Sequence, residues 1–145
     1  MTAPEKRLEG VDAVRAFVTA GNAIFTLRNP ATGNRFTFRV RRSEPREGAE
    51  PILFVGVLTG EDNTGDYSYL GCIFPDGFRV TKKSRISADA PSARAFAWFW
   101  RRVSAGADVS PAEVWHTGHC GRCGRLLTVP ESIETGLGPV CAEAA

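Results

Sequence analysis

Three cysteines and two histidines near the end of the chain have the residue types and spacing of zinc ligands. Cys120 and Cys123 form a Cys-x-x-Cys pair, and Cys141 follows close to the last residue. Two thiolates three residues apart can bind one ion from a tight turn, as in a zinc knuckle. Gly121 and Gly124 would let backbone amides approach the sulfurs. The pattern therefore predicts a zinc site, which Cys141 would complete from the start of a terminal helix.

A tetrahedral structural site requires a fourth ligand, and the candidates are His116, His119 and Cys72. His116 precedes Cys120 by four residues, which is a workable reach. His119 is adjacent to Cys120, so the two side chains would have difficulty binding the same ion. Cys72 falls within a predicted strand, where a lone cysteine is more often an inert core residue. We predict a closed structural site whose ligands are His116, Cys120, Cys123 and Cys141, with His119 as the alternative fourth ligand.

The cysteine pair fits other kinds of site less well. A thioredoxin-like redox pair requires a helix that begins at the first cysteine, whereas glycine and a strand-like Leu126–Val129 follow here. A deaminase zinc site would carry His-x-Glu ahead of the pair. The sequence also lacks His-Glu-x-x-His, Gly-x-Ser-x-Gly, a P-loop and a dinucleotide fingerprint. We therefore expect no enzymatic activity and predict no small-molecule substrate.

Basic residues suggest a second kind of site. Residues 79–125 contain nine basic and three acidic side chains, a local charge of +6 in a chain whose net charge is +2. Such asymmetry points to a polyanionic partner. Arginines that serve only to keep the protein soluble would give the same excess of positive charge.

A helix predicted over residues 92–103 carries Trp98 on its polar face. Arg94, Arg101 and Arg102 lie three or four residues from Trp98, so the four side chains can touch. An aromatic ring among guanidinium groups suits stacking on single-stranded nucleic acid. It equally suits a protein-binding hot spot, and a third possibility is that Trp98 packs beneath the cysteine segment.

The segment Arg35–Arg42 alternates in polarity with the period of a strand. Phe36, Phe38 and Val40 should point into the core, which leaves basic side chains on the opposite face. The predicted binding surface for nucleic acid or a protein partner consists of Arg35, Arg39, Arg41, Lys82, Lys83, Arg85, Arg94, Trp98, Arg101, Arg102 and Arg122.

Periodicity elsewhere predicts the elements that must position these residues. A helix is expected over Leu8–Ala20, and the second helix ends near Ser104. Between them, apolar runs predict about five antiparallel strands in meander order, at 24–28, 35–42, 52–58, 69–74 and 78–81. The expected fold class is α+β: an N-terminal helix, a β-meander of about five strands covered by a helix, and a C-terminal treble-clef or zinc-ribbon-like module. Residues 1–108 would form the α+β domain and residues 109–145 the zinc-binding module.

Composition and cysteine usage indicate the compartment. Hydrophobic residues make up 43% of the 145 residues, enough for a core, and no apolar run approaches the roughly 20 residues that span a bilayer. The N-terminal residues lack the apolar centre of a signal peptide. Clustered cysteines in a reducing compartment favour metal over disulfides. We expect a cytoplasmic protein that does not bind membranes.

The C-terminal motif resembles a short domain of unknown function that occurs in bacteriophage, plasmid and bacterial proteins. The resemblance rests on residues 115–141, and above all on Cys-Gly-Arg-Cys-Gly-Arg-x-Leu-Thr-x-Pro-Glu-Ser-Ile-x-x-Gly-x-Gly-Pro-x-Cys. Residues 20–38 and 82–87 are also similar to small phage-type proteins that carry this domain. The resemblance implies an intracellular zinc-binding accessory protein of mobile-element origin, with ligands at Cys120, Cys123 and Cys141, and it implies no reaction.

Two functions are compatible with these features. The first is a small zinc-stabilised protein that binds DNA or RNA through the basic surface around Trp98. The second is a phage effector that binds and inhibits a host protein or defence complex. The sequence favours the first only slightly, because tryptophan and arginine serve both kinds of contact.

Overall fold

The computed structural model describes residues 6–43, 52–60, 66–127 and 130–137. Their elements, in chain order, are β1 (Lys6–Leu8), α1 (Val11–Val18), β2 (Asn22–Arg28), β3 (Arg35–Arg42), β4 (Leu53–Leu58), β5 (Tyr67–Phe74), β6 (Gly77–Arg79), α2 (Pro91–Ser104), β7 (Glu113–His116) and α3 (Pro130–Thr135).

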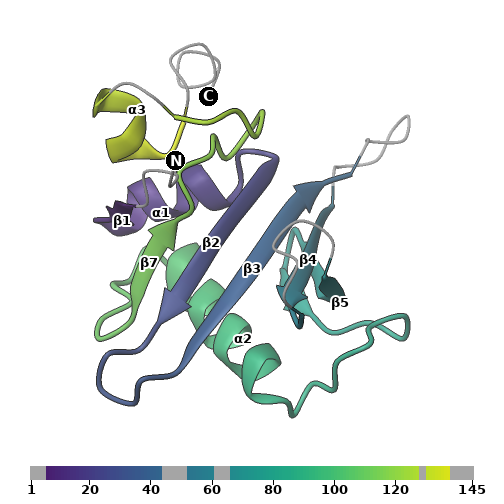
Figure 1. The fold of residues 1–145 in the computed structure, drawn as a ribbon. Coiled ribbons are helices and arrows are strands. Elements are labelled where there is room, and N and C mark those ends of the chain that lie inside the picture. Colours follow the sequence, from purple (N-terminus) through teal and green to yellow (C-terminus); the bar gives the residue numbers. More distant parts are fainter. Residues whose placement is uncertain (1–5, 44–51, 61–65, 128–129, 138–145) are drawn as a thin grey trace.

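The strands form one antiparallel sheet in the order β1-β7-β2-β3-β4-β5-β6 (Figure 1). The expected α+β fold with a five-stranded meander covered by a helix is therefore wrong. In its described part the protein is mainly a seven-stranded antiparallel sheet with three short helices. The two strands that the sequence did not reveal, β1 and β7, have 3 and 4 residues, too few to show a clear period.

The ends of the chain also depart from expectation. Leu8 pairs in β1, and the chain turns at Gly10 before α1 begins, so the first helix is shorter than the predicted 8–20. The strand predicted over 126–129 is reduced, in its described part, to one bridge between His119 and Leu126. The terminal helix expected at Cys141 lies outside the described residues.

One face of the sheet and one face of α2 enclose the core. In β3, Phe38 and Val40 are fully buried, as the alternation predicted. The ring of Phe96 in α2 lies 5.0 Å from that of Phe38 and 4.8 Å from that of Phe78 in β6. Because strands three places apart in the sheet reach the same ring, the sheet curls around α2. No helix in the described ranges is long and apolar enough to cross a lipid bilayer.

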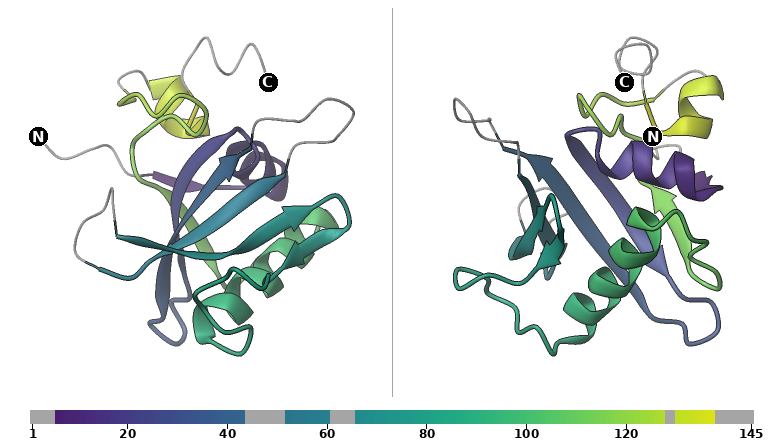
Figure 2. Two further views of the ribbon diagram at one scale, coloured as in Figure 1. Left: turned by 90° about the vertical axis from the view of Figure 1, so that its right-hand side faces the viewer. Right: turned by 180° about the vertical axis from the view of Figure 1, so that it is seen from behind.

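The other face of the sheet, which we call the open face, carries Trp115 of β7, Thr26 of β2, Thr37 and Arg39 of β3 and Tyr67 of β5. Trp115 is the register partner of Thr26, and Thr26 is that of Thr37. The hydroxyls of the two threonines lie 2.8 Å apart. Figure 1 looks onto this face of β2 and β3, whereas the view from behind in Figure 2 has α2 in front of the same strands.

The C-terminal segment is built into the sheet. β7 lies between β1 and β2, with Val114 opposite both Leu8 and Leu27. The expected boundary between residues 108 and 109 falls in the connection from α2 to β7. Residues 113–116 therefore belong to the same sheet as strands β1 to β6, and the cysteine turn begins four residues after this inner strand.

Phe17 of α1 joins the cysteine segment to the core. Its side chain is fully buried, and its ring lies 5.9 Å from the ring of His116 and 6.5 Å from that of Phe25. A Cβ atom at Gly121 would come within 2.7 Å of the Phe17 ring, and one at Gly136 within 2.6 Å. The glycines are therefore needed for close approach to Phe17, a packing reason that the sequence did not suggest for Gly121.

We expect Phe17→Ala to lower the free energy of unfolding by about 3–5 kcal/mol, since it removes a buried ring from the contact between α1, β2 and the cysteine segment. Phe54→Ala, which truncates a ring that is 45% exposed, should cost less than about 1 kcal/mol. Urea unfolding followed by tryptophan fluorescence measures both. Equal losses in the two variants would contradict this role of Phe17.

Candidate functional site

The Cys120–Cys123 segment forms a tight turn at the end of the sheet. The Cys120 amide donates to the Arg125 carbonyl at 2.8 Å, and the Gly124 amide donates to the Cys120 carbonyl at 2.9 Å. The Arg122 amide points at the Cys120 sulfur from 3.4 Å. An amide aimed at a sulfur stabilises a thiolate, so the turn has the chemistry that a metal-binding cysteine pair requires.

His116 lies in the core, with both ring nitrogens against backbone groups. The Gly118 amide donates to Nδ1 at 3.0 Å, which places the ring proton on Nε2, and Nε2 donates to the Ile133 carbonyl at 2.5 Å. The side chain is fully buried. His116 thus connects β7 to α3, and binding a metal through this side chain would have to replace one of the two hydrogen bonds.

The other predicted ligands differ in exposure. Cys120 is buried, whereas Cys123 and His119 are exposed. Cys141 lies outside the described residues. Within the described ranges, no three His, Cys, Asp or Glu side chains lie together so that they could hold a metal ion. Cys72 is buried in β5, where the Tyr69 hydroxyl lies 2.8 Å from its sulfur.

Charge is divided unevenly across the open face. On the side of β7, Glu113 lies 3.7 Å from guanidinium nitrogens of both Arg7 and Arg28 and accepts a hydrogen bond from the Trp115 indole at 3.2 Å. Arg28 is the register partner of Arg35. One carboxylate therefore offsets one of the positive charges on this half of the face.

The half of the open face over β3, β4 and β5 is cationic and aromatic. The Arg39 guanidinium lies 4.5 Å from the centre of the Tyr67 ring. The half-exposed Phe54 ring meets Tyr69 edge-on at 6.2 Å. With Arg41 these side chains line a shallow depression of about 130 Å³. We call these five residues the sheet patch.

Electrostatics at the sheet patch favour an anion. Burial and then the like charge of Arg41 lower the pKa of Arg39, with Tyr67 acting in the opposite direction. Burial raises the pKa of Tyr67, an effect that Arg39 partly opposes. Arg39 stays charged and Tyr67 stays neutral at physiological pH. A negatively charged ligand would relieve the repulsion between the two guanidinium groups.

The predicted basic loop borders the sheet patch. The Arg85 amide donates to the Tyr69 carbonyl at 2.9 Å, and the Thr81 hydroxyl donates to the Tyr69 hydroxyl at 3.1 Å. These bonds fasten residues 81–85 beside β5. Lys82, Lys83 and Arg85 are exposed there.

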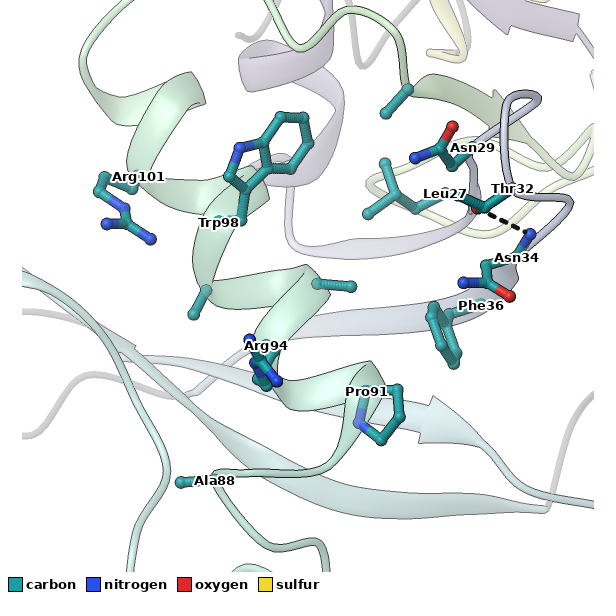
Figure 3. Close-up of a pocket in the computed structure, with 13 residues that line it drawn as sticks. Leu27, Asn29, Thr32, Asn34, Phe36, Ala88, Pro91, Arg94, Trp98 and Arg101 are labelled. Carbon is teal, nitrogen blue, oxygen red and sulfur yellow. Dashed lines mark hydrogen bonds between the residues drawn. The ribbon is translucent and has the colours of Figure 1, made fainter.

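The structure divides the predicted binding surface into separate groups. Arg35, Arg39 and Arg41 lie on the open face, whereas Arg94, Trp98 and Arg101 lie on α2 beyond the other face (Figure 3). Arg122 is exposed in the cysteine turn, which meets β2 through the bond from the Asn22 amide to the Gly121 carbonyl. A single contact surface that includes all the predicted residues is therefore not formed.

Sequence reasoning missed the aromatic side of the open face. Phe54, Tyr67 and Tyr69 come from two strands whose register contains a bulge between Val55 and Gly56. Tyr67 also lies just before the strand predicted at 69–74. Alternation within 67–69 was the available signal, but only the pairing of β4 with β5 brings these rings beside Arg39.

The comparisons with known proteins concern the C-terminal segment. Residues 110–145 match a family described as "Family of unknown function (DUF6011)". The matched segment includes β7 and the cysteine turn, and the description assigns no activity. No curated protein and no solved structure matches the chain.

We expect His116→Ala to lower the free energy of unfolding by about 2–4 kcal/mol, because it leaves the Gly118 amide and the Ile133 carbonyl without their side-chain partner. His119→Ala, at an exposed position, should cost less than about 0.5 kcal/mol. Urea unfolding should be compared at equal metal content, determined by native mass spectrometry. If the loss in His116→Ala appeared only together with loss of metal, the hydrogen bonds would not be its cause.

Proposed function

We propose that this protein binds single-stranded nucleic acid at the sheet patch and the adjoining Lys82–Arg85 loop, and that a structural zinc ion stabilises its C-terminal segment. The observation that carries the proposal is the Arg39 guanidinium over the Tyr67 ring, with Arg41 and the exposed Phe54 ring beside it. Aromatic rings on an open sheet can stack on bases, and flanking cations bind the phosphates.

A single strand suits this surface better than a duplex does. Stacking requires bases that are free to leave their neighbours, and the rings here lie in a shallow depression of a sheet. The surrounding positive charges belong to arginines and lysines that are held on strands and on residues 82–85. A flexible phosphate backbone can adapt its path to these fixed charges. The predicted alternative, a phage effector that occupies a host protein, would use the same rings and cations as hot-spot residues.

Removing the two charges of the sheet patch should weaken nucleic-acid binding selectively. In Arg39→Gln/Arg41→Gln, we expect affinity for single-stranded DNA and RNA 20-mers to fall by about a hundredfold, since two charge-assisted contacts of about 1.5 kcal/mol each are lost. The slope of log K against log salt should become shallower by about 1.4, or about 0.7 for each lost phosphate contact. Fluorescence anisotropy at several salt concentrations measures both quantities.

The matched control is Arg7→Gln/Arg28→Gln, which removes two charges from the same face at positions that both pair with Glu113. It should change affinity by less than about threefold. An equal loss in both variants would mean that binding depends on total charge alone. If the unmodified protein bound neither DNA nor RNA at physiological salt but held a specific host protein through the sheet patch, the effector function would replace this proposal.

The zinc proposal rests on the chemistry of the cysteine turn. Cys120 and Cys123 occupy a tight turn with an amide aimed at the Cys120 sulfur, and Cys141 would supply the third thiolate. His116 is the predicted fourth ligand and His119 the alternative. The two backbone hydrogen bonds of His116 favour His119 for this position. Four protein ligands would leave no coordination position for a substrate, so the ion would be structural.

Cys123→Ser should release the zinc and unfold at least the C-terminal quarter of the chain, because the binding energy of a structural zinc ion contributes directly to folding. Cys72→Ser provides the matched control, since Cys72 is held by Tyr69 within the sheet. It should keep one zinc per chain. Native mass spectrometry and hydrogen exchange distinguish the two variants, and full retention of zinc by Cys123→Ser would show that the ligand set is wrong.

A further inference from the structure

A cavity of about 670 Å³ lies on the helix side of the sheet, between α2 and the turn that joins β2 to β3 (Figure 3). Its volume is in the range of small-molecule sites. Trp98, Pro91 and Ala95 form its α2 wall, and Leu27 and Phe36 form part of the opposite wall. This cavity has no signature in the sequence, because the strand residues and the helix residues meet only in the folded chain.

The aromatic wall is held in place before any ligand binds. The Arg102 guanidinium lies over the Trp98 ring, 5.7 Å from its centre. Arg102 is itself anchored by a hydrogen bond from its Nε to the Asp108 carbonyl. The ring projects from α2 on the side of Leu27 and Asn29 (Figure 3). Trp98 thus offers a flat, partly buried surface of fixed orientation, which suits a planar aromatic ligand.

Amide groups line the side of the cavity formed by the β2–β3 turn. The backbones of Asn29 and Asn34 are joined by a hydrogen bond from the Asn29 backbone N–H to the Asn34 backbone carbonyl at 2.8 Å. The Asn29 side chain accepts from the Ala31 amide at 3.0 Å. The side-chain amide of Asn34 has no partner among the described residues, so its donor and its acceptor remain available for the edge of a heterocycle.

Two arginines supply positive charge at the rim. Arg94 and Arg101 are two turns apart on α2 and line the cavity on either side of Trp98. Both are exposed, and neither makes an ion pair within the described part of the chain. A ligand that fills the site should therefore combine a planar aromatic ring, hydrogen-bonding edges and an anionic group.

We infer that this cavity binds a nucleoside monophosphate, either as a free nucleotide or as the terminal unit of a strand. The base would stack on Trp98 with its edge at Asn34, and the phosphate would be held by Arg94 and Arg101. The cavity and the sheet patch are on opposite sides of the sheet, so this inference does not rest on the proposed function.

Isothermal titration calorimetry of the full chain with AMP, GMP, CMP and UMP tests the inference. We expect saturable binding of at least one nucleotide with one site per chain. Arg94→Gln/Arg101→Gln changes only exposed side chains and should raise Kd at least about tenfold, as expected for loss of a charge-assisted contact. Trp98→Ala should also weaken binding, and Trp98→Phe should restore part of it. Arg39→Gln/Arg41→Gln should leave Kd unchanged.

A second titration, with the same nucleotide at the 5′-phosphorylated end of a short oligonucleotide and with the unphosphorylated oligonucleotide, separates the two sources. Tighter binding that depends on both the terminal phosphate and Arg94/Arg101 would identify a strand end, whereas preference for AMP-sized ligands would identify a free nucleotide. The inference is overturned if no mononucleotide binds at millimolar concentration, or if Arg94→Gln/Arg101→Gln binds as the unmodified protein does. Neither result bears on nucleic-acid binding at the sheet patch, which the anisotropy measurements on Arg39→Gln/Arg41→Gln test.

Discussion

The insertion of β7 between β1 and β2 is the constraint on which the rest of the structure depends. It brings residues 113–116 from late in the chain into the sheet, second from one edge, and leaves β1 at that edge. The alternating side chains of β7 then serve both faces: Val114 and His116 enter the core, and Glu113 and Trp115 reach the open face. The cysteine turn follows at once, so its position is set by the sheet.

Phe17 and His116 extend this connection to the C-terminal segment. Phe17 fills the space that Gly121 and Gly136 leave, and His116 holds the Ile133 carbonyl of α3. A zinc ion at Cys120 and Cys123 would therefore stabilise residues that already contact α1 and β7. Of the segment that matches the family, residues 113–116 form β7 of the larger sheet.

Both faces of the sheet offer cations beside aromatic rings, but in different settings. On the open face, Arg39 lies over Tyr67 in a shallow depression, and Glu113 pairs with Arg7 and Arg28 at the side of β7. On the helix side, Trp98 lines a larger cavity together with Arg94 and Arg101. The first setting suits an extended strand and the second a compact ligand, because depth and enclosure limit the size of what can enter.

The sequence by itself determined the local features whose cause is short-range. The alternation in Arg35–Arg42 predicted the face of each β3 residue, and the apolar stripe of residues 92–103 predicted α2, since both periods are set within a few residues. The spacing of Cys120 and Cys123 predicted a tight turn for the same reason. Only the tertiary structure decided the seven-stranded order, the role of Phe17 between two glycines and the separation of Arg39 from Trp98. These depend on which distant segments pair, and strands as short as β1 and β7 carry too little pattern to specify a partner.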